Sequence, residues 1–81
     1  MGSGWMIGVM VELPGEPKPL RHFFAVGPED PARAEWPAID RAMMIGGVAV
    51  SPVGGLEPVH AISELTPQIV KSLALKPGEV R

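Results

Sequence analysis

The residues best suited to chemistry in this 81-residue chain are two histidines and two glutamates. His22 and His60 could each act as an acid or a base, because imidazole gains or loses a proton near neutral pH. Together with Glu12 or Glu57 they could line a pocket that binds a metal ion or abstracts a proton. Their spacing matches neither His-x-x-x-His nor Glu-x-x-His. Such a pocket would therefore depend on tertiary structure alone.

Three of these four candidates also have a plain structural interpretation, which the sequence favours. His22 is expected at the periphery of a sheet, His60 in an exposed loop, and Glu12 in a cross-strand pair with Arg21. The chain contains no Gly-x-Ser-x-Gly, Gly-x-Gly-x-x-Gly or Walker pattern and no cysteine. No cofactor, metal site or catalytic activity is therefore predicted, and His22, His60 and Glu12 remain weak catalytic candidates.

Basic residues are spread along the chain and form no cluster. There are seven, against nine acidic residues, and the net charge is −2. They are Lys18, Arg21, Arg33, Arg41, Lys71, Lys76 and Arg81. Because affinity for nucleic acid comes from several cations acting together on one face, no nucleic-acid partner is expected. The longest apolar run, from Trp5 to Val11, is about a third of a membrane span, so no membrane insertion is expected either.

The composition predicts one small domain that associates with itself. We expect a single domain over 1–81, with residues 1–4 disordered or left from an expression tag and residues 79–81 frayed. A chain this short buries only about 60–65% of its unfolded surface. The hydrophobic fraction of 46% and the mean hydropathy of +0.20 are high for such a chain. A homodimer is therefore predicted. The apolar run is not preceded by the basic region of a signal peptide, so the expected compartment is the cytoplasm.

Residues 5–26 are predicted to form a β-hairpin. The odd positions of the first strand are all large and apolar: Trp5, Ile7, Val9, Val11 and Leu13. Three prolines between residues 14 and 19 cannot donate ladder hydrogen bonds, so this segment is a turn region. The second strand then covers residues 20–26.

The register of this hairpin follows from placing Leu13 opposite Leu20. The resulting pairs are Val11 with His22, Val9 with Phe24, Ile7 with Val26 and, on the reverse side, Glu12 with Arg21. The reverse face then carries Met6, Met10 and Phe23. An uncovered sheet face of this kind could be buried by a second copy of the chain.

A helix is predicted over residues 31–45. Asp30 is a suitable N-cap, and Pro31 suits the first helical position because its missing N–H is not needed there. The predicted core face follows the helical repeat and comprises Ala32, Trp36, Ile39 and Met43.

Pro37 interrupts this predicted helix. It cannot donate a hydrogen bond to the Arg33 carbonyl, so we expect a kink or a break. Gly46 is expected to close the helix in a left-handed cap. Because Met43 belongs to the predicted core, Met44 is left as a candidate contact for a partner.

The second half of the chain is less regular. Residues 48–53 predict a strand, and Gly54-Gly55 predicts a turn into residues 56–62, which form either a strand or an extended loop because of Pro52 and Pro58. A second helix is predicted after Thr66 as N-cap and Pro67 at its first position. Its apolar side comprises Ile69, Val70, Leu73 and Ala74, and Leu65 is placed to contact Val70.

The predicted fold class is therefore α+β, with the order ββαβ(β)α. Both helices are expected on one face of a small antiparallel or mixed sheet. The favoured function is a self-associating protein-interaction module without catalytic activity, with Met6, Met10, Phe23 and Met44 as the possible interaction surface. The alternative is a small-molecule-binding domain or enzyme whose pocket contains His22 and either Glu12 or His60.

Overall fold

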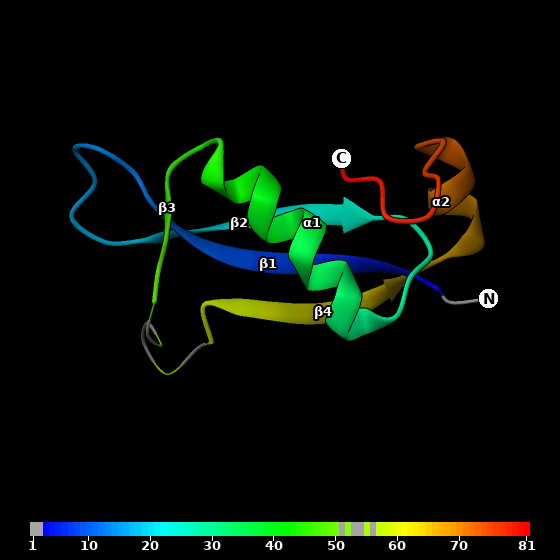
Figure 1. Ribbon diagram of the computed structural model, residues 1–81, viewed down its shortest axis with the longest axis horizontal. Coiled ribbons are helices and arrows are strands. Elements are labelled where there is room, and N and C mark those ends of the chain that lie inside the picture. Colours follow the sequence, from blue (N-terminus) through cyan, green and yellow to red (C-terminus); the bar gives the residue numbers. More distant parts are fainter. Residues whose placement is uncertain (1–2, 51, 53–54, 56) are drawn as a thin grey trace.

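The computed structural model describes residues 3–50, 52, 55 and 57–81. These described residues contain four strands and two helices. Their order along the chain is the one predicted from the sequence (Figure 1). Their bounds are β1 Gly4–Glu12, β2 Leu20–Val26, α1 Pro31–Met43, β3 Gly47–Val48, β4 Val59–Leu65 and α2 Pro67–Ser72. The α+β class is confirmed.

The first strand lies at the centre of the sheet. It pairs antiparallel with β2 along one edge and with β4 and the short β3 along the other. The pairing of β1 with β4 is interrupted by a bulge, because Met6 faces Ser63 and Ile7 faces Ala61. The α1 helix crosses one face of this sheet, and α2 lies at the end where the chain begins (Figure 1).

The hairpin register differs from the prediction by two residues. Val11 pairs with Leu20 and Val9 pairs with His22. Arg21 is opposite Met10, so the predicted pair with Glu12 is not formed. A slip of two residues keeps every side chain on its predicted face, because strand side chains alternate with period two.

The main core lies between α1 and the sheet. Four strand residues, Ile7, Val9, Val11 and Val26, are fully buried there together with Ala34, Ala38 and Ala42 of α1. The predicted helix face is therefore wrong, since Trp36 is 68% exposed and Met43 is 63% exposed. Alanines four residues apart give the helix a narrow side, which allows its backbone to approach the sheet closely.

The ends of α1 agree with the sequence more closely than its face does. The Asp30 carboxylate accepts a hydrogen bond from the Ala32 N–H at 2.9 Å, which confirms the N-cap. The helix continues through Pro37 to Met43, so of the two predicted alternatives, a kink or a break, the break is wrong. Gly46 does not adopt the left-handed conformation. Its missing side chain instead leaves room for the Glu12 carbonyl oxygen, which a Cβ would overlap.

A second, smaller core lies beneath α2. It comprises Ala25, Leu65 and Leu75, with Met6 and Val70 packed against them. Met6 and Ala25 are a cross-strand pair, and they alternate with the α1-facing pair of Ile7 and Phe24. The two helices therefore contact opposite faces of the sheet, in contrast to the predicted single helical layer.

The start of α2 follows its local sequence. The Thr66 hydroxyl accepts a hydrogen bond from the Ile69 N–H at 3.2 Å, and Leu65 and Val70 belong to the same apolar cluster, as predicted. The predicted apolar side is otherwise wrong, because Ile69 and Leu73 are 43% and 37% exposed and Ala74 is exposed.

In the remaining segments, the observed bounds of the elements differ from the predicted ones. Of the strand expected over 48–53, Val48 lies in β3, while the described residues 49, 50 and 52 are not in a strand. The segment 56–62, expected as a strand or an extended loop, contains the start of β4 at Val59. The predicted Gly54-Gly55 turn lies partly outside the described residues. Gly4, expected in a disordered segment, begins β1. Residues 79–81, expected to fray, lie along β2, where the Ala25 and Arg81 backbones exchange two hydrogen bonds.

Replacing Ala74 by glycine is expected to stabilise the protein by about 0.5–1 kcal/mol. Ala74 has φ +52°, and the N–H groups of Ala74 and Leu75 donate to the Lys71 and Val70 carbonyls. Glycine adopts this left-handed C-cap without the steric cost of a Cβ. Urea denaturation measures the change. The control, Ala32→Gly in the exposed first turn of α1, should destabilise, and a loss of stability with Ala74→Gly would contradict the assignment.

Candidate functional site

The predicted catalytic residues do not converge. His22 is half-buried and pairs with Val9 on the α1 side of the sheet. His60 is exposed and pairs with Gly8 on the reverse side. Because Gly8 and Val9 are neighbours in one strand, the two histidines point to opposite faces.

The glutamates do not complete a site either. Glu12 is exposed at the end of β1, and Glu57 is exposed before β4. Within residues 3–50, 52, 55 and 57–81, no three acidic, histidine or cysteine side chains are placed to hold a metal ion. The hypothesis of a His22 pocket therefore receives no geometric support.

The predicted interaction surface is also divided. Met10 is only 7% exposed, and Met6 packs into the core beneath α2. Phe23 is 57% exposed on the reverse face of the sheet. Met44 is 80% exposed, but it follows α1 on the opposite side of the molecule. These four residues do not form one surface.

A different apolar surface lies on the exposed side of α1. Trp36, Met43 and Met44 are each more than 60% exposed, and Ile45 beyond them is 43% exposed. Arg33 and Asp40 are exposed on the same side of the helix, by the 3.6-residue repeat. We call Arg33, Trp36, Asp40, Met43 and Met44 together the Trp36 face.

A hollow of about 400 Å³ adjoins the Trp36 face. One wall is α1, and the other is the C-terminal segment that lies along β2. The lining residues are Pro37, Asp40, Arg41, Met44, Glu79, Val80 and Arg81. In the described residues, the one ion pair joins Arg81 to Glu79 at 3.7 Å, and it lies in this lining. We call this cavity the α1 hollow.

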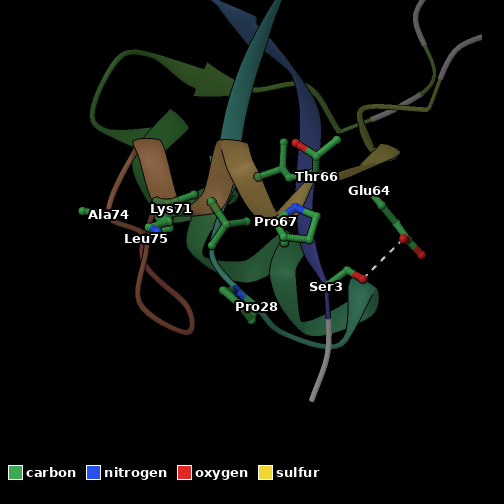
Figure 2. Close-up of a pocket in the computed structure, with 11 residues that line it drawn as sticks. Ser3, Pro28, Glu64, Thr66, Pro67, Lys71, Ala74 and Leu75 are labelled. Atoms are coloured by element: carbon green, nitrogen blue, oxygen red, sulfur yellow. Dashed lines mark hydrogen bonds between the residues drawn. The ribbon is translucent and has the colours of Figure 1, made fainter.

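A larger groove of about 860 Å³ opens beside α2 (Figure 2). Its lining is mainly apolar and includes Leu65, Val70 and Leu75. At its edge the Ser3 hydroxyl donates a hydrogen bond to the Glu64 carboxylate at 3.3 Å. Neither histidine lines this groove, so it is distinct from the pocket predicted from the sequence.

The spacing of the large apolar residues predicts Trp36 in the core and therefore does not reveal the Trp36 face. The usable signal was the row of alanines at 34, 38 and 42, which marks a second helix face of small apolar residues. Judged by side-chain size alone, the face with tryptophan and methionine is the one expected to be buried. Which face is buried depends instead on how closely the helix approaches the sheet.

Comparisons of the chain with models of protein families, with curated proteins and with solved structures found no match. Among the described residues, no helix has both the length and the apolar character needed to cross a bilayer.

Proposed function

We propose that the protein is a self-associating interaction module without catalytic activity, acting in the cytoplasm, and that the Trp36 face is its contact surface. The observation that supports this proposal is the exposure of Trp36 and Met43 on α1 and of Met44 at its C-cap. Tryptophan and methionine are enriched where proteins bind one another, and contiguous exposed apolar residues mark such sites. The high hydrophobic fraction of the chain agrees with this proposal.

The alternative function, small-molecule binding, finds its best support in the groove beside α2. Its volume of about 860 Å³ is within the range of ligand sites. The polar side chains that could fix a ligand there are few: Ser3, Glu64, Thr66 and Lys71, of which the last three are exposed. Self-association therefore has the stronger support.

Sedimentation equilibrium over about 5–500 µM tests the proposal. The expected result is an apparent mass that rises from that of the 8.6 kDa monomer towards twice this value. A constant monomer mass across the whole range would contradict self-association. Dynamic light scattering on the same samples should show a dimer and no larger aggregates.

A further inference from the structure

The Trp36 face carries a projecting aromatic side chain. Trp36 is 68% exposed, and Met43, 63% exposed, lies two helical turns further along the same face. Resting on the proposed function, we infer that two copies pair their α1 helices antiparallel through the Trp36 face, so that Trp36 of each copy packs against Met43 of the other. Such a contact is isologous, because each copy offers the same surface.

A two-fold axis at the level of residue 38 sets the register of the pair. It places Trp36 of one copy at the level of Asp40 of the other. By the helical repeat, Trp36 and Met43 lie on one side of the seam between the helices, and Arg33 and Asp40 lie on the other.

Charge selects the antiparallel direction. Arg33, Trp36, Asp40 and Met43 follow the three-four-three spacing of a helix seam. With the two-fold axis at the level of residue 38, Arg33 of one copy lies at the level of Met43 of the other. Measured along the helix axis, this level is about 4.5 Å from Asp40. An Arg side chain can span this distance. A parallel pair would instead place like charges together, with Arg33 beside Arg33 and Asp40 beside Asp40, which is unfavourable.

The charges needed for this contact are available. The described part of the chain gives neither Arg33 nor Asp40 an ion-pair partner, and both are exposed.

The small size of the contact favours weak association. The α1 helix has 13 residues, so it is about 20 Å long. A single pair of such helices buries an area at the low end for specific complexes, below about 1,200 Å² in total. We therefore expect a weak dimer, with a Kd of about 10–100 µM.

The decisive experiment compares two aromatic truncations by sedimentation equilibrium. Trp36→Ala should raise the dimer Kd at least tenfold, because it removes the central side chain of the contact. Phe23→Ala is the matched control, since Phe23 is 57% exposed on the reverse sheet face. It should leave the Kd unchanged. Circular dichroism melts of both variants establish that the fold is retained.

The possible outcomes separate the two proposals. If Phe23→Ala abolishes the dimer while Trp36→Ala does not, the protein still self-associates but the pairing through α1 is overturned. If the unmodified chain is monomeric at about 500 µM, the proposed function itself fails.

A charge exchange tests the antiparallel direction. Arg33→Asp and Asp40→Arg should each weaken the dimer about three- to tenfold, because each variant brings like charges together across the interface. The double variant Arg33→Asp with Asp40→Arg should restore the original Kd to within about twofold. A double variant that dimerises no better than either single one would overturn the antiparallel arrangement.

Discussion

Replacing Gly27 by alanine is expected to lower the free energy of unfolding by about 2–3 kcal/mol and to detach the C-terminal segment from β2. A Cβ at this position would overlap the carbonyl oxygen of Lys76. The obstacle is backbone, which no side-chain rotation can relieve. The hydrogen bond from the Gly27 N–H to the Glu79 carbonyl, 2.8 Å in length, would be lost with the displacement.

Urea denaturation and amide hydrogen exchange measure these two effects. The amides of Ala25, Gly27 and Arg81 form the contact between β2 and the segment, so their protection should fall most. Gly78→Ala is the matched control. Gly78 has φ +77° with open space around it, so alanine there should cost only about 1 kcal/mol of backbone strain. Equal losses for the two variants would contradict a steric role of Gly27.

The sequence correctly predicts the helix N-caps and the strand faces, which depend on interactions between residues close in sequence. The Asp30 and Thr66 caps depend on side chains that bond two or three residues ahead, and both are formed. The face of each hairpin residue depends only on its parity, and this is also correct. The register is wrong because a two-residue slip leaves the alternation of apolar and polar residues unchanged. Nothing in the pattern could have revealed it.

Contacts between residues far apart in the sequence could not be predicted from the pattern of apolar and polar residues. His22 and His60 lie far apart in sequence, and the bulge at Ile62 is needed to know which face His60 occupies. The pairing of residues 79–81 with β2 depends on the path of the chain after α2. The site candidates failed for this reason, since no spacing in the sequence fixes which side chains meet.

The face of α1 is the most informative error, because the helix has two apolar sides. One carries Trp36 and Met43, and the other carries the alanines at 34, 38 and 42. Burying the large side gains more apolar area, but it would hold the helix away from the sheet. Burying the alanine side keeps the helix close to Ile7, Val9 and Phe24, which already supply bulk.

Substitution of Ala38 by leucine decides between these two helix orientations. Ala38 is fully buried against the sheet, so leucine should cost about 2–3 kcal/mol through overpacking. Ala32→Leu, on the exposed side, should change stability by no more than about 0.5 kcal/mol. Urea denaturation at low micromolar concentration, where the monomer dominates, measures both changes.

The same measurement on Trp36→Ala completes the argument. In the observed orientation the indole is mostly exposed, so its removal should cost less than about 1 kcal/mol in the monomer. If the helix were rotated to bury it, the loss would be about 3–5 kcal/mol, and Ala38→Leu would then be nearly neutral. A small loss at position 36 with a large loss at position 38 is the combination that leaves the tryptophan free to bind a second copy.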